Sequence, residues 1–296
     1  MSKQTRGSLL LILTTMIWGA AFVAQQESMN YIGPFTMQAT RFFLAGLVLM
    51  PVIALCDKKG FTVNPPATRA QKKRQLLCGI VCGVLLFVAA TMQQFGLLYT
   101  SIGKSGFITA LYVIFVPIIG VLLKQKVPLR IWLCALLALV GLYILCVPDA
   151  EALNLGDGLT LIAAVMFAVQ IVYIGKVCTD LDGVRLSCVQ SFTVSLLSVI
   201  GMVLTETPSL DAILACWLPI CYAGILSSGV AYTLQIVGQQ DVKPTLASII
   251  MGLESVFAAL FGWLIAGQSL SAIELTGCII MFAANFLAQM PEKKRA

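Results

Sequence analysis

The chain has 296 residues, of which 59% are hydrophobic and only 11% are charged. Soluble globular domains carry about 25% charged residues, so a water-soluble fold is excluded for most of this chain and a lipid environment is expected. The formal net charge of +6 requires no nucleic-acid partner, because basic residues also gather beside the anionic inner leaflet of a membrane. The sequence contains no histidine, which excludes any metal site or proton relay built on imidazole.

Ten apolar runs follow one another along the chain, separated by short polar segments. A membrane-spanning helix needs about 20 mostly apolar residues. The strands of a membrane barrel would instead alternate polar and apolar residues, which these runs do not. The sequence therefore predicts an all-α membrane protein with ten transmembrane helices and no separate soluble domain. The predicted helices lie near residues 8–27, 33–55, 75–98, 103–123, 130–147, 157–175, 184–204, 212–236, 244–266 and 272–289.

The lysines and arginines predict how these helices are oriented. If the N-terminus is cytoplasmic, 17 of the 19 basic residues fall on cytoplasmic segments, Lys104 falls on the outer side, and Arg41 lies within the second helix. Cytoplasmic loops of membrane proteins carry an excess of Lys and Arg. We therefore expect a multi-pass protein with both termini in the cytoplasm.

The chain contains an internal repeat. Residues 88–96 (V-A-A-T-M-Q-Q-F-G) match residues 230–238 (V-A-Y-T-L-Q-I-V-G) at five of nine positions, at a shift of 142 residues. Each half, residues 1–148 and 149–296, then holds five helices. Because five is odd, the second half enters the membrane from the opposite side. Such inverted repeats are typical of transporters, although an old duplication without alternating access would leave the same pattern. A shift of 149 residues relates three further pairs: Gly7 and Gly156, Trp18 and Phe167, and Arg41 and Gln190.

Five segments carry a resemblance to a known family. They are residues 17–22 (I-W-G-A-A-F), 41–43 (R-F-F), 106–117 (G-F-I-T-A-L-Y-V-I-F-V-P), 222–235 (Y-A-G-I-L-S-S-G-V-A-Y-T-L-Q) and 248–264 (S-I-I-M-G-L-E-S-V-F-A-A-L-F-G-W-L). Over nearly its whole length the chain resembles the EamA-type transporters of the drug/metabolite transporter superfamily, which have ten helices in two repeats. The resemblance implies export or uptake of a metabolite at the plasma (inner) membrane of a bacterial-type cell. Ser255 stands where the family often has proline, and Gln268 where it often has glutamate.

Two ionisable residues lie well inside predicted helices, Arg41 in the second and Glu254 in the ninth. A charge at the bilayer centre costs about 2.5–3.5 kcal/mol on insertion scales, so both side chains are expected to face the interior of the bundle. We interpret Arg41 as an anchor for a substrate carboxylate or phosphate, and Glu254 as a residue that couples transport to a proton or another cation. A structural ion pair, or two separate hydrogen-bonded charges, would satisfy the same burial cost.

Polar residues recur on one face of several predicted helices, as in the stripe of Ser228, Tyr232, Gln235 and Gln239. Such stripes suit a substrate cavity, although hydrogen bonds between helices are the alternative for any one residue. We further hypothesise that the repeat-related Gln93 and Gln235 serve an outer and an inner gate, which normal transport by leucine variants would contradict. The predicted cavity residues are Trp18, Arg41, Gln93, Gln94, Thr109, Tyr112, Gln170, Tyr232 and Gln235, with Glu254 as the coupling residue.

Together these features predict a secondary transporter that exports a small organic metabolite, amino acid-like or drug-like, by alternating access. No phosphate-binding loop of the G-x-x-x-x-G-K-[ST] type occurs, so coupling to an ion gradient or to the substrate gradient is expected. No catalytic residue, cofactor or metal site is predicted. A channel and a membrane enzyme are the alternatives. The only aspartates two positions apart, Asp180 and Asp182, are more typical of a turn cap than of a metal site. The family resemblance also allows a homodimer that pairs through the fifth and tenth helices, but the sequence does not require one.

Overall fold

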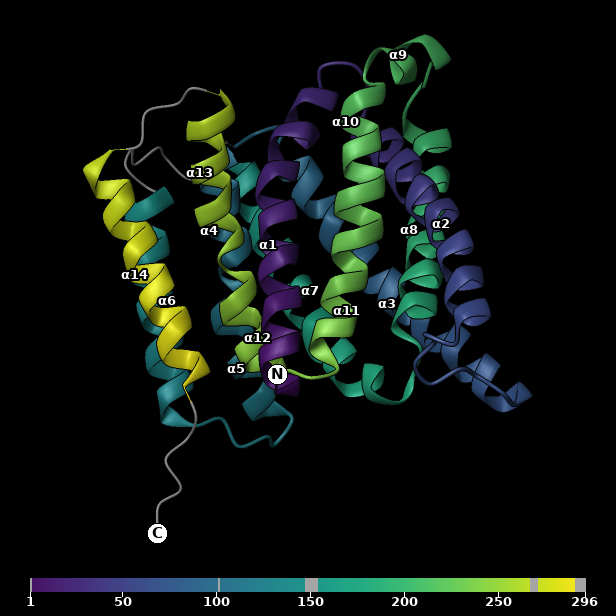
Figure 1. The fold of residues 1–296 in the computed structure, drawn as a ribbon. Helices are drawn as coiled ribbons and strands as arrows, with labels where there is room; N and C mark the ends of the chain where they lie inside the picture. The colour runs from purple at the N-terminus through teal and green to yellow at the C-terminus, as the bar shows by residue number, and fades with distance from the viewer. Residues whose placement is uncertain (1, 101, 147–153, 267–270, 291–296) are drawn as a thin grey trace.

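The structure is a computed structural model that describes residues 2–100, 102–146, 154–266 and 271–290. The described residues form helices and no strand, and the helices stand side by side as one bundle (Figure 1). Nine helical spans in the described residues are long and apolar enough to cross a membrane, and a tenth helix has a shorter apolar stretch, Leu129–Leu145. The predicted all-α membrane fold is confirmed.

Seven of the predicted spans are single helices in the described part of the chain. The ends of these helices extend past the apolar runs where capping groups are present. The third helix, for example, begins at Arg69 rather than near residue 75, because Thr68 and Gln71 form a capping box at its N-terminus. The seven helices are α1 (Lys3–Ser28), α2 (Pro34–Lys59), α3 (Arg69–Gly96), α6 (Leu129–Cys146), α7 (Leu155–Val177), α8 (Gly183–Thr205) and α14 (Ala272–Gln289).

The fourth and ninth spans are broken near their middles. The fourth consists of α4 (Ile102–Ala110) and α5 (Tyr112–Leu122), and the ninth consists of α12 (Pro244–Met251) and α13 (Glu254–Ala266). The breaks fall at Leu111 and at Gly252–Leu253, and the shift of 142 residues relates Leu111 to Leu253. The ninth span is therefore interrupted although Ser255 replaces the proline common in the family. Gln268 lies outside the described residues.

The eighth span is the most irregular. It consists of α9 (Leu210–Ala215), α10 (Trp217–Cys221), the ten-residue π-helix η2 (Tyr222–Ala231) and α11 (Tyr232–Gln239). π-Helices are rare and often occur at functional sites. A short 3-10 helix, η1 (Cys178–Asp180), leads into α8, whose N-terminus is capped by the Asp182 carboxylate. The sequence favoured a cap for this aspartate, but on a turn; the structure has it at the start of a helix.

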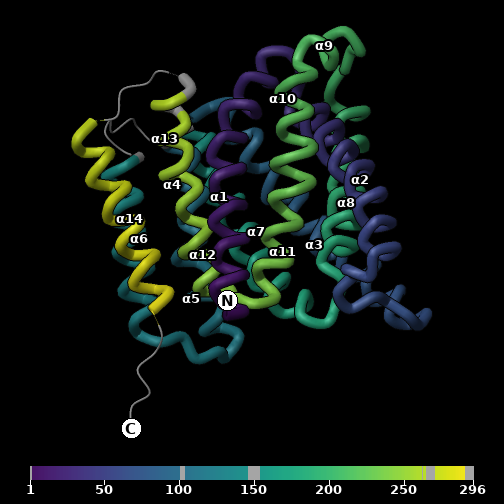
Figure 2. The backbone as a smooth tube through the Cα atoms, viewed as in Figure 1, coloured from purple at the N-terminus to yellow at the C-terminus, as the bar shows by residue number. Residues whose placement is uncertain are grey.

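The packing of the helices repeats with inverted orientation. α3 packs on α7, and the equivalent α11 packs on α1 (Figure 2). Where α3 ends and α7 begins, a Cβ atom on Gly156 would lie 2.6 Å from the carbonyl oxygen of Gly96. Where α1 begins and α11 ends, a Cβ atom on Gly7 would lie 2.7 Å from the carbonyl oxygen of Gly238. These four glycines are the two pairs that the sequence shifts relate, so the same close crossing occurs once at each end of the bundle.

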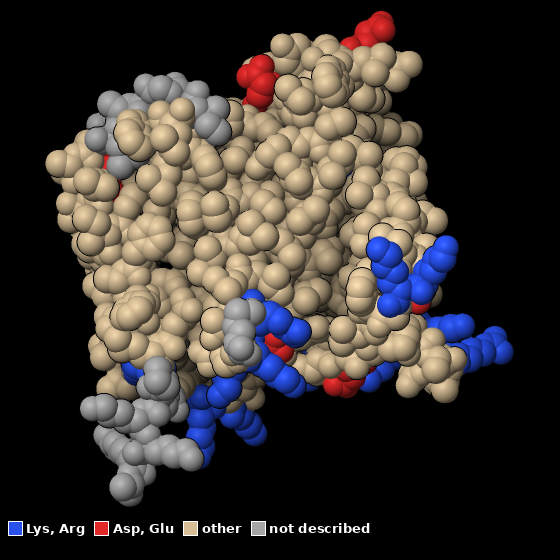
Figure 3. Space-filling model, in the orientation of Figure 1, with Lys and Arg blue, Asp and Glu red and all other residues tan. Residues whose placement is uncertain are grey.

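Charge is distributed unevenly over the bundle. On the face shown in Figure 3, Lys and Arg gather at the end where α1 begins, which we call the basic end. Lys104 lies at the other end, which we call the opposite end, and its Nζ atom pairs with Asp157 at 2.7 Å. Between the two ends, large apolar side chains such as Leu47, Leu136 and Phe286 are exposed. A wide exposed apolar surface is expected where a protein meets lipid.

Candidate functional site

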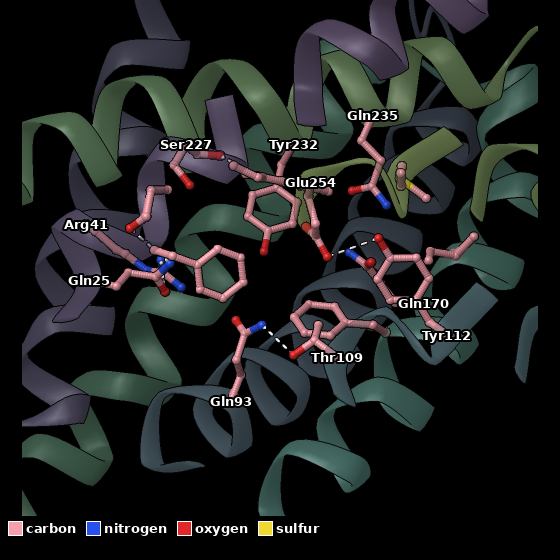
Figure 4. A pocket seen from close by; sticks show the side chains of 16 residues that line it. Gln25, Arg41, Gln93, Thr109, Tyr112, Gln170, Ser227, Tyr232, Gln235 and Glu254 are labelled. Atoms are coloured by element: carbon pink, nitrogen blue, oxygen red, sulfur yellow. Dashed lines mark hydrogen bonds between the residues drawn. The ribbon is translucent and has the colours of Figure 1, made fainter. Parts of the chain in front are cut away.

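A cavity lies among the helices that carry the predicted polar residues. Its free volume is about 40 Å³, which is room for a few water molecules rather than for a metabolite, so a substrate could enter only if the helices moved apart. Figure 4 shows its polar side chains pointing toward one another. The sixteen lining residues are Trp18, Ala21, Phe22, Gln25, Arg41, Gln93, Thr109, Tyr112, Phe167, Gln170, Ile171, Ser227, Tyr232, Gln235, Met251 and Glu254.

Nine of the ten residues predicted from the sequence belong to this lining. The structure places the tenth, Gln94, outside it. Neighbouring residues of an α-helix point about 100° apart, so the cavity that receives the side chain of Gln93 does not also receive that of Gln94. Gln94 is fully buried, and neither end of its amide has a hydrogen-bond partner in the described structure.

The polar stripe predicted on the eighth span is displaced by the π-helix. Ser227, not Ser228, lines the cavity together with Tyr232. The two residues are five positions apart, which is the spacing of a π-helix and not of an α-helix. Three hydrogen bonds from side chains fix η2 against α1. Trp18 Nε1 donates to the carbonyl oxygen of Ser227 at 3.2 Å, the Tyr222 hydroxyl to that of Ile17 at 2.9 Å, and the Thr14 hydroxyl to that of Ala231 at 3.3 Å.

Arg41 forms one end of the cavity and is only 2% exposed. Its Nε atom donates to Gln38 Oε1 at 2.8 Å and its Nη1 atom to Gln25 Oε1 at 2.9 Å. The guanidinium carbon also lies 4.7 Å from the centre of the Phe42 ring, a favourable position for a cation. Sequence reasoning had not predicted that Gln25 and Gln38 hold Arg41, although both lie near it on the first two helices.

Glu254 is the first residue of α13 and is 5% exposed. Its Oε1 atom accepts a hydrogen bond of 3.1 Å from the Tyr112 hydroxyl. Tyr112 and Glu254 each follow a helix break and are related by the shift of 142 residues, so the two broken spans meet at this bond. No ion pair of the described residues joins Glu254 to Arg41 or involves either of them. The described residues thus contain no ion pair between the two, and the other alternative, two separately hydrogen-bonded charges, agrees with the contacts of Arg41 and Glu254.

The internal repeat accounts for most of the cavity lining. Twelve of the sixteen lining residues form six pairs that the two shifts relate, so the cavity lies where the two halves of the chain face each other. Inverted-repeat transporters bind their substrates at such an interface. The pairs are Trp18 and Phe167, Ala21 and Gln170, Phe22 and Ile171, Gln93 and Gln235, Thr109 and Met251, and Tyr112 and Glu254.

The cavity lies between the two glycine crossings. Gln93 stands one helical turn before Gly96, and Gln235 one turn before Gly238. The Nε2 atom of Gln93 donates to Thr109 Oγ1 at 3.0 Å, whereas Oε1 of Gln235 has no partner in the described structure. Each predicted gate residue therefore separates the cavity from one close crossing of helices.

Each crossing also lies beside an ion pair between the two halves. At the opposite end the pair is Lys104 with Asp157, and Asp157 also accepts a hydrogen bond of 2.8 Å from the Thr100 hydroxyl. At the basic end, Arg6 Nη2 lies 2.7 Å from Asp241 Oδ2. A cavity of this kind, lined by polar and aromatic groups and with a helix crossing and an ion pair toward each end, can hold a small organic molecule once the helices move apart.

Comparisons with known proteins agree with this architecture. The model of the EamA-like transporter family matches residues 5–147 and again residues 154–289. An uncharacterized transporter of Archaeoglobus fulgidus is 29% identical over 97% of this chain and 87% of its own length. The uncharacterized transporter YoaV of Bacillus subtilis is 21% identical over 94% of both chains.

Two further similarities extend this result. A WAT1-related protein of Arabidopsis thaliana is 25% identical over 96% of this chain and 69% of its own length. A solved crystal structure has a TM-score of 0.78 at 18% identity and covers 96% of both chains, which supports the fold. The two matches to the family model span nearly all of this chain, one in each five-helix half. The protein is therefore a multi-pass membrane transporter of the EamA-like transporter family.

Proposed function

We propose that the protein is a secondary carrier that exports one small organic metabolite by alternating access. The observation that carries this proposal is the central cavity, because twelve of its sixteen lining residues are repeat-related. Two similar halves of opposite orientation can exchange conformations, so that one site opens first to one side and then to the other. The moving units are the two halves, residues 1–148 and 149–296.

The two crossings and their ion pairs act as the gates of this cycle. The pair of Lys104 and Asp157 and the crossing of Gly96 and Gly156 close the opposite end. The pair of Arg6 and Asp241 and the crossing of Gly7 and Gly238 close the basic end. In this proposal the structure represents an occluded state of the cycle, which the small volume of the cavity supports.

Glu254 is the proposed coupling residue. It is a buried carboxylate without a cationic partner, and it faces a cavity that opens to either side in turn. The other charged or titratable groups of the lining are Tyr112, which donates to Glu254, Tyr232 and Arg41. A proton taken up by Glu254 on one side and released on the other would link substrate movement to the proton gradient.

The basic end faces the cytoplasm in this proposal. The excess of Lys and Arg at that end supports the orientation. Both termini then lie in the cytoplasm, and the membrane is the plasma (inner) membrane of a bacterial-type cell. The metabolite would enter the cavity from the basic end and leave at the opposite end.

Counterflow in proteoliposomes tests the proposal. Vesicles loaded with a mixture of unlabelled metabolites are diluted into labelled amino acids and other small metabolites. A carrier concentrates the labelled form of its substrate transiently inside the vesicles, and this uptake saturates with concentration. Flux that neither saturates nor counterflows would favour a channel instead, and a wild-type protein that moves no compound would contradict the proposal.

A further inference from the structure

Four lining residues of the cavity break its internal symmetry. These four, which do not belong to the six repeat pairs, are Gln25, Arg41, Ser227 and Tyr232. At the repeat-equivalent positions the chain has Ile174 for Gln25, Gln190 for Arg41 and Ala90 for Tyr232. The cavity therefore carries the cationic Arg41 on one side of its symmetry axis, whereas the uncharged Gln190 stands at the matching place on the other.

The π-helix explains why the asymmetry is confined to this place. η2 packs on both α1 and α2, the helices that hold Gln25 and Arg41. A Cβ atom on Gly224 of η2 would lie 3.0 Å from the carbonyl oxygen of Arg41, so the two backbones are close. The described residues of the equivalent helix, α3, are continuous α-helix from Arg69 to Gly96. The irregular span thus builds a feature that the repeat by itself does not provide.

The charge of Arg41 has no paired carboxylate among the described residues. Its two hydrogen-bond acceptors are amide oxygens of Gln25 and Gln38, which orient the guanidinium but carry no charge. The described residues give no acceptor to its Nη2 atom, and none of their carboxylates pairs with it. A buried cation without an anion is costly unless an anion is supplied from outside the protein.

We propose that the substrate bears a single carboxylate, which binds to Arg41 at the asymmetric end of the cavity, and a compact apolar or aromatic body. The planar guanidinium matches a carboxylate in shape and can donate two hydrogen bonds to it. One cation balances one negative charge, whereas a phosphate dianion would leave an excess of negative charge in the cavity that also contains Glu254. The aromatic rings of Trp18, Phe167 and Tyr232 provide walls for the body of the substrate.

This inference deepens the proposed function and rests on the cavity being the transport site, so it is tested by binding as well as by transport. The probes are amino acids and simple carboxylic acids with aliphatic or aromatic bodies, each paired with its carboxamide. Binding is measured as a shift in the melting temperature of the purified protein. We expect some acids to stabilise the wild type and their amides to have no effect, since the amide lacks the charge that Arg41 requires.

Arg41→Gln is the decisive variant, because the chain itself has Gln190 at the repeat-equivalent position. The variant is expected to fold and to bind the acids about 10- to 100-fold more weakly, the effect of losing a charge-assisted hydrogen bond. Arg41→Lys should retain part of the affinity. Arg130→Gln, the same substitution outside the cavity lining, should bind like the wild type.

Three results would overturn the inference: no acid of the panel binds, amides bind as well as their acids, or Arg41→Gln binds the acids with unchanged affinity. Failure of the proposed function is distinct from these. Acids that bind through Arg41 without any counterflow would leave the binding site intact and contradict the carrier. Counterflow of a compound without a carboxylate would support the carrier and contradict this inference.

Discussion

If Glu254 couples transport as proposed, a variant at this residue separates coupling from substrate exchange. Its carboxylate lines the cavity and accepts one hydrogen bond from Tyr112. Glutamine has the same shape and keeps an oxygen that can accept this bond, but it cannot carry a proton across the membrane. In proteoliposomes we therefore expect Glu254→Gln to retain counterflow within about threefold of the wild type and to lose accumulation driven by a pH gradient, because neutral exchange needs no change of charge at this position.

The control for this variant is Glu27→Gln, which makes the same chemical change at an exposed position near the end of α1. It should retain both counterflow and pH-driven accumulation. If Glu254→Gln kept its accumulation in a pH gradient, Glu254 would hold the broken helices together through Tyr112 without coupling transport. If it lost counterflow as well, its carboxylate would serve substrate binding or folding.

At the residue scale, the sequence predicted most of the residues that line the cavity but few of the hydrogen bonds between them. Arg41 and Glu254 stood out because charges are rare in membrane spans, and both line the cavity. The hydrogen bonds by which Gln25 and Gln38 orient Arg41 were not predicted, since a glutamine near a helix end is unremarkable by composition. Gln94 was included because it neighbours Gln93, and only the rotation of α3 separates the two.

At the scale of the helices, Gly156 tests the close crossing of α3 and α7. A Cβ atom on this residue would lie 2.6 Å from the carbonyl oxygen of Gly96, a distance that requires the helices to move apart. We expect Gly156→Ala to destabilise the fold by about 1–3 kcal/mol, as overpacking usually does, and to lower the melting temperature of the purified protein.

Gly158→Ala is the matched control, because Gly158 lies two residues further along α7 and a Cβ atom there would meet nothing within 4 Å. Alanine favours helix more than glycine does, so this variant should melt at the same temperature as the wild type or slightly above it. Equal melting temperatures for wild type, Gly156→Ala and Gly158→Ala would show that the crossing tolerates separation and does not close the opposite end.

The helices themselves were predicted far better than their irregularities. Runs of apolar residues report burial in lipid, and they located all ten spans with ends within a few residues for most of them. The same runs carry no signal for the breaks at Leu111 and Gly252–Leu253, or for the π-helix η2, because an interrupted helix in a membrane is as apolar as a continuous one. The prediction of a polar stripe through Ser228 assumed 3.6 residues per turn, and η2 invalidates that assumption.

At the scale of the whole molecule, the repeat was visible in the sequence, and its consequence for the cavity was not. The two shifts predicted inverted halves, and the glycine crossings of α3 with α7 and of α1 with α11 follow both shifts. Trp18 and Phe167 face the same space, as do Tyr112 and Glu254. This arrangement depends on how the two halves dock. Docking is decided by contacts between residues more than a hundred positions apart, which no local pattern encodes.

Four ion pairs of the described residues join the halves. The two that lie beside the glycine crossings, Lys104 with Asp157 and Arg6 with Asp241, predict how the molecule opens at each end. Removing the charge of Asp157 or Asp241 should weaken the closed state at one end only. Asparagine keeps an oxygen that can accept hydrogen bonds, so Asp157→Asn retains the cap that this side chain provides at the start of α7. The side chain of Lys104 is 14% exposed and that of Arg6 is 53% exposed, so water screens the pair at the basic end more strongly. We expect the open population to rise about tenfold in Asp157→Asn and about twofold in Asp241→Asn.

A cysteine at Ser227, in a background without the native cysteines, would report this opening because Ser227 lines the cavity. A membrane-impermeant maleimide applied to sealed vesicles should label it faster from the periplasmic side in Asp157→Asn and from the cytoplasmic side in Asp241→Asn.

Asp180→Asn is the control, since it removes a pair with Arg74 whose side chains are 52% and 60% exposed, and it should leave both rates unchanged. Faster labelling from one and the same side in both variants would contradict the assignment of the two pairs to separate gates. Faster labelling of Asp157→Asn from the cytoplasm and of Asp241→Asn from the periplasm would keep the gates and invert the proposed orientation.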